Sequence, residues 1–581
     1  MDKRTVGAIV LIGLILLISN TSLYRRMVGM PPKQQAEKQE VMSQQEMPAD
    51  EPEIPQTDLA PSPAALAEGD RQALLGIDAS ARVEAKTVTI LGQLFRGAID
   101  TRGGLLSSWE IKPKKKDPAK QDWVTLMPED ASEGGLELVL RLDDGPVALD
   151  AMVFETDVDT LILSPEQPRG TIVLTAQTDR GLRVEKTFEF DNGRHDFQLE
   201  IVIEGADVLG EARNYALWWR PGLPTTEDNY RDDLRAFAAH TMMGDVVEKT
   251  SIKGQTVEDS SFTGDTRWLA IQTKYFLMAM IPPAGIDGVG AELRGSYQKE
   301  DEDNGLKENK IIAGGILMPL DGGRCDHRWT IYLGPMDYFT LKDFGIGLER
   351  TVYLGRSVLR WIGMIILHAF VHLHRMLPNY GVVIIIFSII VKIIFYPLTR
   401  KSIASIRKMQ ELQPEIKKLQ EKYKKEPAKL QKATMEMYRK YNVNPASGCF
   451  PMLLQMPVFF AMYAVFRNTI ELRGASFLWI KDLSAPDTIL KLSSKLPLYG
   501  DKVNILPIVM AVTMFLQQKR SMKDPKQAYM VYIMPLFLFF IFNNISSGLV
   551  LYWTMFNLLQ LLQESIHPHT PTVIVSEGEK E

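Results

Sequence analysis

A run of about twenty mostly apolar residues, GVVIIIFSIIVKIIFYPLTRK at 381–401, limits the possible folds more than any other segment. A helix of that length crosses the hydrocarbon core of a bilayer, so we expect a membrane span here. Lys392 interrupts the run, and an unpaired ammonium inside a bilayer is costly. On a helix, Ser388, Lys392 and Tyr396 share one face. That polar stripe favours a hydrated cavity, while snorkelling of the lysine toward Arg400, about 12 Å along the helix, is the alternative.

The second half of the chain repeats this pattern of apolar segments divided by basic loops. Four further spans are predicted by apolar segments near 449–466, 503–517, 529–545 and 548–563. Only NISSG separates the last two, which predicts a tight helical hairpin. Basic loops face the cytoplasm, and 399–441 carries thirteen Lys or Arg against five Glu, while 518–526 is also basic.

An apolar core near the N-terminus, Val6–Ile18, follows two basic residues. It predicts a first span that stays as a signal anchor, with a cleaved signal peptide as the alternative. With this span the count becomes six. We therefore expect both termini in the cytoplasm and one large exported region after the first span.

The exported region changes character along its length. Residues 27–79 are rich in Pro, Gln and Glu, which predicts an extended, disordered tether. Alternating apolar and polar residues then dominate. LRVEKTFEF and FQLEIVI each place apolar residues on one face, and they flank Asp191–Gly193, which is a strong hairpin signal. We expect a large antiparallel sandwich over 80–344.

This exported region shows no nucleophile elbow, phosphate loop or metal-ligand spacing, and His195, His240 and His327 are far apart in the sequence. We therefore expect no enzyme, no cofactor and no metal site. Cys325 and Cys449 fall on different sides of the predicted boundary between the exported and membrane regions, so we expect no disulfide.

Two amphipathic segments flank the second span. Residues 345–378 mix apolar residues, among them Trp361, with Arg and His, which predicts a helix lying in the membrane interface. His368 and His372 have metal-ligand spacing, although side chains at headgroup level are the favoured interpretation. Residues 399–447 carry a helical apolar stripe and Pro427 at a predicted helix start. They indicate a cytoplasmic helical hairpin, which charge alone interprets equally well as a solvated spacer or as a docking arm.

Polar side chains also occur in the other predicted spans: Gln455, Thr513, Gln517, Gln518, Asn543, Asn544, Tyr552, Trp553, Asn557 and Gln560. Such residues face the interior of a bundle or a wet cavity rather than lipid. The core of the second to fifth spans holds no Asp or Glu, and Glu564 only ends the sixth. Lys392 therefore has no obvious ion-pair partner.

Four stretches between about 380 and 564 closely resemble the YidC/Oxa/Alb family of membrane protein insertases: VKIIFYPLTRKSIASIRKMQELQPEIKKLQEKY, NVNPASGCFPMLLQMPVFFAMYAVFRNTIELRGASFLWIKDLSAPD, LPIVMAVTMFLQQK and SSGLVLYWTMFNLLQ. The anchor, the tether and the β-rich region extend the resemblance to the Gram-negative branch. It implies a five-helix insertase core in the cell inner membrane and a periplasmic β domain that resembles the supersandwich of sugar-processing enzymes.

The resemblance also implies a hydrophilic groove that opens to the cytoplasm and to lipid. The groove residues expected to contact clients are Lys392, Ser388, Tyr396, Gln455, Tyr552 and Trp553. Relatives usually carry arginine where Lys392 stands, so charge is kept but the bidentate fork is lost. Many relatives end in a basic tail, whereas 567–581 is short and acidic. Cytoplasmic docking then falls to Arg407, Lys408, Lys417, Lys418, Lys519 and Arg520.

The expected function is insertion and folding of inner-membrane proteins, alone and with the Sec translocon, without covalent chemistry. Expected partners are nascent membrane proteins, the Sec translocon, the phospholipid bilayer and, through the basic loops, the ribosome, with no small-molecule substrate. An ion-coupled solute transporter and a structural assembly factor for Sec remain alternatives. The predicted organisation is an anchor at 1–26, a tether at 27–79, a periplasmic domain at 80–344, an interfacial helix at 345–378, a second span at 379–398, a cytoplasmic hairpin at 399–447, four spans at 448–566 and a tail at 567–581.

Overall fold

The computed structural model describes Leu75 and residues 84–112, 123–127, 133–252, 257–286, 288–302, 305–441, 443, 450–496, 499–521 and 528–566. The chain divides into two compact units, Met1–Pro61 and Ser62–Glu581, and all described residues belong to the second. The expected anchor at 1–26, the tether at 27–79 apart from Leu75, the tail at 567–581 and Cys449 lie outside the described residues.

Within the described residues, eighteen strands form one continuous hydrogen-bonded sheet, and the pairings are antiparallel apart from that of β1 with β7. The strands are β1 (Thr87–Leu91), β2 (Phe95–Asp100), β3 (Leu105–Ile111), β4 (Val124–Met127), β5 (Gly135–Leu142), β6 (Gly145–Ala148), β7 (Thr160–Ile162), β8 (Arg169–Gln177), β9 (Arg183–Asp191), β10 (Asp196–Glu204), β11 (Ala212–Trp219), β12 (Ala238–Met243), β13 (Val246–Thr250), β14 (Val257–Gln272), β15 (Phe276–Ile281), β16 (Gly288–Glu302), β17 (Gly305–Pro319) and β18 (Cys325–Pro335).

The two ends of this sheet face each other across an aromatic core. Successive pairings lead from β8 through β9, β10, β18, β15, β14, β16, β17, β11, β5, β3 and β2 to β1. The rings of Phe95 on β2 and Trp109 on β3 nevertheless lie 5.9 Å and 6.1 Å from that of Phe190 on β9, centroid to centroid. The sheet therefore folds over on itself, and the predicted sandwich is confirmed.

The predicted hairpin is also confirmed, since β9 and β10 pair with Phe190 opposite Phe197. One residue of β9 was not predicted to be buried. Lys186 lies on the apolar face between Val184 and Phe188 and is completely buried. Its ammonium donates to three main-chain carbonyls, those of Gly103, Gly104 and Leu136, at 2.9–3.0 Å. These bonds satisfy the buried charge.

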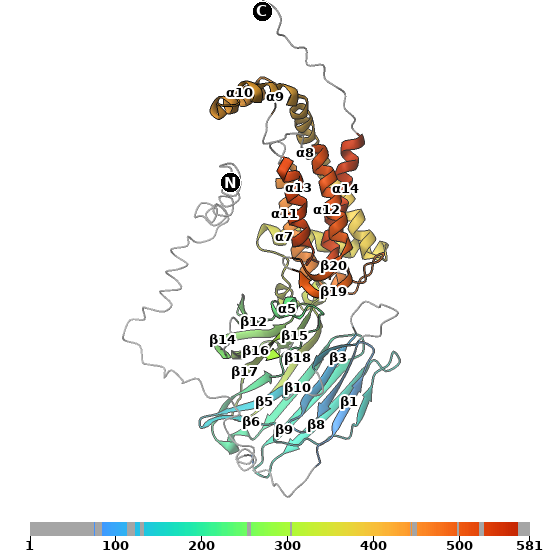
Figure 1. Ribbon diagram of the computed structural model, residues 1–581. Coiled ribbons are helices and arrows are strands. Elements are labelled where there is room, and N and C mark those ends of the chain that lie inside the picture. The colour runs from blue at the N-terminus through green and yellow to red at the C-terminus, as the bar shows by residue number, and fades with distance from the viewer. Residues whose placement is uncertain are drawn as a thin grey trace, which may run out of the picture. The chain divides into compact units, whose positions relative to one another are not determined.

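The part of the chain after the β domain is helical, and a small hairpin of two strands joins two of its helices. The elements are α6 (Tyr338–Asp343), α7 (Val358–Met376), α8 (Tyr380–Glu411), α9 (Gln413–Lys422), α10 (Pro427–Lys440), α11 (Phe450–Asn468), β19 (Thr488–Leu496), β20 (Gly500–Asn504), α12 (Ile505–Ser521), α13 (Ala528–Phe542) and α14 (Ser547–Ile566). In Figure 1, α12 lies between α13 and α14, and it packs against both. The connection at 543–546 is short as expected, but α13 and α14 do not form an isolated hairpin.

By length and composition, the described helices include one that is long and apolar enough to cross a membrane, Tyr380–Pro397 of α8, and Val531–Phe542 is apolar but shorter. The structure does not by itself confirm six spans. Asn379 caps the start of α8 by accepting hydrogen bonds from the amides of Gly381 and Val382. Gly381 is needed there because a Cβ atom would overlap the ring of Phe477.

Two boundaries differ from the predictions. Helix α8 does not end at 398 but continues through Pro397 to Glu411, so the span and the first cytoplasmic helix are one element. Pro427 does open α10, as expected. Helix α7 begins at Val358 rather than at 345, because the preceding residues hold only a short 3-10 turn at Leu348–Thr351.

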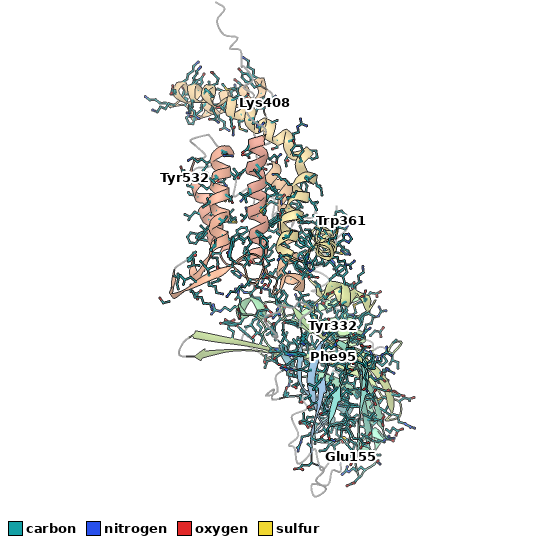
Figure 2. The ribbon with its side chains drawn as sticks, turned by 90° about the vertical axis from the view of Figure 1, so that its right-hand side faces the viewer. Phe95, Glu155, Tyr332, Trp361, Lys408 and Tyr532 are labelled. Carbon is teal, nitrogen blue, oxygen red and sulfur yellow. The ribbon has the colours of Figure 1, made fainter. Side chains whose placement is uncertain are left out.

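The predicted single apolar face of α7 is divided in two. Ile366 is buried against the bundle, whereas Val358, Trp361 and Ile365 are exposed, Trp361 by 62 % (Figure 2). His368 bonds to the carbonyl of Met364 at 2.8 Å through Nδ1. Helix α7 therefore buries one apolar side against the bundle and leaves a second apolar side exposed on the surface of the protein.

Candidate functional site

The side chain of Lys392 extends from α8 toward α14, where its ammonium contacts an amide and an aromatic ring. The residue is only 9 % exposed. Its Nζ donates to Oε1 of Gln560 and lies 4.6 Å from the ring centroid of Phe556. Gln560 in turn donates from Nε2 to Oε1 of Glu564 at 3.0 Å. The lysine is thus linked to a carboxylate through one amide, although it forms no direct ion pair with the described residues.

The spacing along α14 explains this arrangement. Phe556, Gln560 and Glu564 follow at four-residue intervals, so they stand above one another on one helix face. That face packs against α8. The four-residue interval was visible in the sequence, but only the pairing of α8 with α14 shows that it meets Lys392.

The remaining residues of the predicted stripe behave differently from Lys392. Ser388 is completely buried, and its hydroxyl donates to the carbonyl of Ile384 in its own helix at 2.7 Å. Tyr396 is half-buried. The stripe therefore supplies one buried cation and two hydroxyls in unlike surroundings, rather than a uniform polar wall.

The predicted residues of α11 and α14 do come together. Gln455 donates from Nε2 to the hydroxyl of Tyr552, and both side chains are buried. The half-buried ring of Trp553 stands edge-on to that of Phe459 at 4.8 Å and lies 5.6 Å from that of Phe542. These contacts place Trp553 where α11, α13 and α14 meet, and Tyr552 beside α11.

Several buried polar atoms in the same bundle have no hydrogen-bond partner in the part of the chain that the structure describes. They are Nε1 of Trp553, Nδ2 of Asn557, Oε1 of Gln518 and both amide atoms of Gln563. Buried polar groups in proteins are almost always paired, and water supplies the bond where protein does not. Because three of these four residues belong to α14, we interpret the atoms as facing water inside the bundle.

The opposite end of the bundle is closed by bonds that are all within protein. Asn504 is completely buried, and its Nδ2 donates to the main-chain and side-chain oxygens of Asn543 at 2.5 Å and 2.9 Å. Nδ2 of Asn543 donates to the carbonyl of Tyr499 at 3.1 Å. Asp487 caps α12 by accepting from the amide of Leu506 at 2.7 Å. These bonds tie the end of β20 to Asn543, just after α13, and Asp487 to the start of α12.

The β domain also contacts this end of the bundle, through charges that were not predicted. Arg467, in the last turn of α11, pairs with Asp232 of α5 (Tyr230–Leu234) at 2.6 Å. Arg473 pairs with Glu227 at 2.7 Å. Burial raises the pKa of the Glu227 carboxyl, and the Arg473 guanidinium lowers it. The ion pairs lie beside a shared apolar cluster that includes Trp268 and helix α7 residues.

The predicted docking residues divide into engaged and available side chains. Arg407 donates to the carbonyl of Glu564 at 3.5 Å, Lys418 pairs with Glu415 at 2.9 Å, and Arg520 donates to the hydroxyl of Ser565 at 3.0 Å. Lys408, marked in Figure 2, and Lys417 and Lys519 are exposed. The contacts of Arg407 and Arg520 hold the C-terminal end of α14 to α8 and α12.

Comparisons with known proteins agree over most of the chain. The model for the 60Kd inner membrane protein matches residues 372–571, and the model for the YidC periplasmic domain matches residues 87–369. A membrane protein insertase YidC of Chlorobaculum tepidum is 34 % identical and covers 87 % of this chain and 86 % of its own. One of Chlorobium phaeovibrioides is 32 % identical and covers 97 % and 94 %. A solved active YidC insertase is 19 % identical, with a TM-score of 0.37 over 84 % of this chain and 94 % of its own.

Proposed function

Since this chain belongs to the YidC family of membrane protein insertases, we propose that it inserts clients through a hydrated groove between α8, α11 and α14. The protein is an inner-membrane insertase with a large periplasmic β domain. We propose further that α8, α11, α12, α13 and α14 are five spans and that the anchor at 1–26 is the sixth. Both termini then lie in the cytoplasm, as the basic loop at 399–441 favours.

One contrast carries the groove proposal. Buried polar atoms of Asn557 and Gln563, in the middle and C-terminal part of α14, have no partner in the described residues, whereas the buried amides of Asn504 and Asn543 at the outer end of the bundle are bonded within protein. A bundle with this contrast is wet toward the cytoplasm and closed toward the periplasm. Lys392 is the cation in the wet part.

The groove lowers the cost of moving a polar segment into the membrane. Lys392 attracts the polar or acidic exported end of a client, and water solvates the rest of it. The apolar span of the client then passes into lipid along α11 and α13, whose outer faces carry exposed apolar residues such as Phe460 and Phe537. For acidic tails the membrane potential adds about 2.3 kcal/mol per charge per 100 mV.

Physical transfer of this kind requires no covalent chemistry and no cofactor. The proposed partners are nascent chains, the Sec translocon and the bilayer. The ribosome would meet the exposed side chains of Lys408, Lys417 and Lys519, because the other three predicted docking residues are engaged within the chain. In the same topology the exposed side of α7, with Trp361, would lie in the periplasmic membrane interface.

The test compares two substitutions and two clients. Lys392→Ala should slow insertion of a small client with an acidic exported tail by about tenfold, because one favourable charge interaction of about 1.4 kcal/mol is lost. Lys392→Arg should behave as wild type, and a client with an uncharged tail should be insensitive to both. Pulse-labelled insertion in cells depleted of the wild-type protein measures this. Equal insertion of both clients by the alanine variant would contradict the proposal, and intact insertion with defective solute uptake would favour a transporter.

A further inference from the structure

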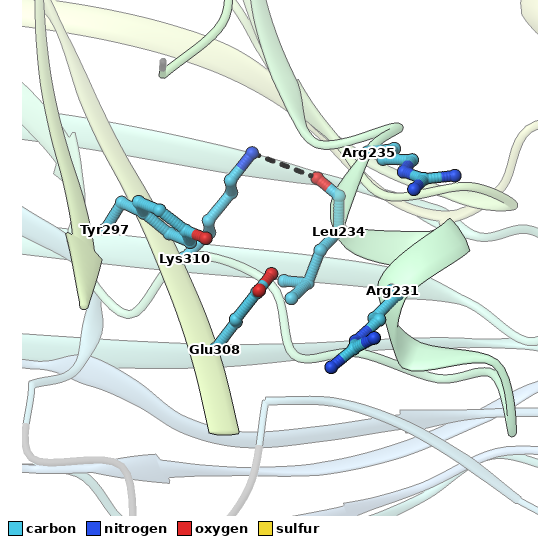
Figure 3. Close-up of a pocket in the computed structure, with 6 residues that line it drawn as sticks. All are labelled: Arg231, Leu234, Arg235, Tyr297, Glu308 and Lys310. Carbon is cyan, nitrogen blue, oxygen red and sulfur yellow. Dashed lines mark hydrogen bonds between the residues drawn. The ribbon is translucent and has the colours of Figure 1, made fainter. Parts of the chain in front are cut away.

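A pocket of about 340 Å³ opens on the β domain beside α5, far along the chain from the groove residues. Helix α5 and the residue that follows it supply one side, and strands β16 and β17 supply the other (Figure 3). The lining residues are Arg231, Leu234, Arg235, Tyr297, Glu308 and Lys310. Three cationic side chains and a single carboxylate thus line one small space.

Among the described residues, no carboxylate forms an ion pair with these three cationic side chains. Nε of Arg231 donates to the hydroxyl of Tyr230 at 3.1 Å. The Lys310 ammonium lies 5.2 Å from the ring centroid of Tyr297. Its hydrogen bonds go to the main-chain carbonyls of Leu234 and Ile252, at 3.3 Å and 3.4 Å, which is beyond the usual length of such bonds. Arg235 is exposed, and it makes no side-chain hydrogen bond or ion pair to the described residues around it.

The pocket favours a small anion with hydroxyl groups. Burial lowers the pKa of Lys310, and the Glu308 carboxylate raises it, so a further negative charge would stabilise the ammonium. Arginine guanidinium groups bind phosphate in bidentate geometry. Glu308 cannot bind an anion, but its carboxylate accepts hydrogen bonds from hydroxyls. Leu234 gives the pocket one buried apolar wall.

The position of α5 places the pocket at the membrane surface. Asp232, next to Arg231, pairs with Arg467 in the last turn of α11. In the proposed topology that turn ends a span at the periplasmic face. Basic and tyrosine side chains are the residues that meet lipid headgroups at this depth.

We propose that this pocket binds the phosphate of an anionic phospholipid in the periplasmic leaflet, with a hydroxyl-bearing headgroup such as that of phosphatidylglycerol. The two arginines hold the phosphate, and Glu308 accepts from the headgroup hydroxyls. The inference rests on the proposed span at α11 but not on the groove. A lipid bound there would anchor the β domain to the bilayer beside α11.

Binding of water-soluble dihexanoyl phosphatidylglycerol to the full chain in phosphatidylcholine nanodiscs tests the proposal. Calorimetric titration of wild type is compared with Arg231→Gln/Arg235→Gln and with a matched control, Arg169→Gln, an exposed arginine on β8. The double variant should bind more weakly by about fivefold for each arginine removed, while the control should match wild type. Circular dichroism of each variant verifies that the exposed substitutions leave the fold intact.

Two competitors distinguish a lipid phosphate from the other anions that the pocket could bind. Inorganic phosphate and a short acidic peptide should each displace the lipid only weakly. Unchanged lipid binding by the double variant would overturn the proposal. So would inorganic phosphate binding as tightly as the lipid, which would indicate a free phosphate, or the peptide binding more tightly, which would indicate a client tail. The titration does not measure insertion, so a negative result in it would not contradict the groove proposal. Likewise, wild-type insertion by Lys392→Ala would not contradict the lipid-binding proposal.

Discussion

Replacing Glu564 with glutamine should change which clients the groove accepts. Glu564 is linked to Lys392 through Gln560. Two hydrogen bonds and the width of one amide separate the charges by at most about 8 Å. At an effective dielectric constant of about 40, between those of protein and water, unit charges at that distance interact by about 1 kcal/mol. A client carboxylate that binds beside Lys392 meets a similar repulsion from Glu564.

Glu564→Gln should therefore increase insertion of a client with an acidic exported tail by about fivefold under limiting conditions, because about 1 kcal/mol of repulsion is removed. A client with an uncharged tail should be unaffected. Insertion into proteoliposomes, followed by protease protection of the tail, measures both. The control is Glu411→Gln, which removes a carboxylate at the inner end of α8. Slower insertion of the acidic client would refute the reasoning, because it would show that Glu564 positions Lys392 rather than competing for it.

Three further predictions concern the β domain and its junction. Burial lowers the pKa of His240 to about 3, so below about pH 6.5 the unfolded chain binds a proton that the folded chain does not. The free energy of unfolding should therefore decrease as the pH is lowered, by about 2 kcal/mol at pH 5. Denaturant titrations should show that His240→Gln removes this pH dependence. Lys186→Met leaves the carbonyls of Gly103, Gly104 and Leu136 without their donor and should lower the free energy of unfolding by about 1–3 kcal/mol, whereas an unchanged midpoint would show that the bonds are dispensable. Arg473→Gln leaves the Glu227 carboxylate unpaired and should speed hydrogen exchange near residue 227, and adding Glu227→Gln should restore part of the protection.

The β domain was the more predictable part of this chain because its signals are local. Alternation in LRVEKTFEF and FQLEIVI located β9 and β10, and the turn residues between them located the hairpin. Lys186 has the same alternation as this buried face, but only the carbonyls of Leu136 on β5 and of Gly103 and Gly104 in the loop between β2 and β3 explain why a lysine is tolerated there. Those carbonyls are 50 to 83 residues away.

The residues of the proposed groove were named from the sequence, but their contacts were not. Apolar runs and polar exceptions identified Lys392, Gln455 and Tyr552, and the structure brings the last two together. The link to Glu564 depends on the packing of α14 against α8. Sequence periodicity indicates the faces of a helix but not which helix packs against it. The span and the first cytoplasmic helix were predicted as separate segments, whereas one helix continues through Pro397, a residue type that usually ends or kinks a helix.

Water access to α14 tests the central claim most directly. Cys325 and Cys449 are first replaced by alanine, and single cysteines are placed at Asn557, which is buried beside the unpaired atoms, and at Phe537, which is 57 % exposed and should face lipid. In inside-out vesicles a membrane-impermeant maleimide should label the cysteine at 557 and not the one at 537, and right-side-out vesicles should protect both. Labelling at 537 with protection at 557 from the cytoplasmic side would contradict a groove that is hydrated and open to the cytoplasm.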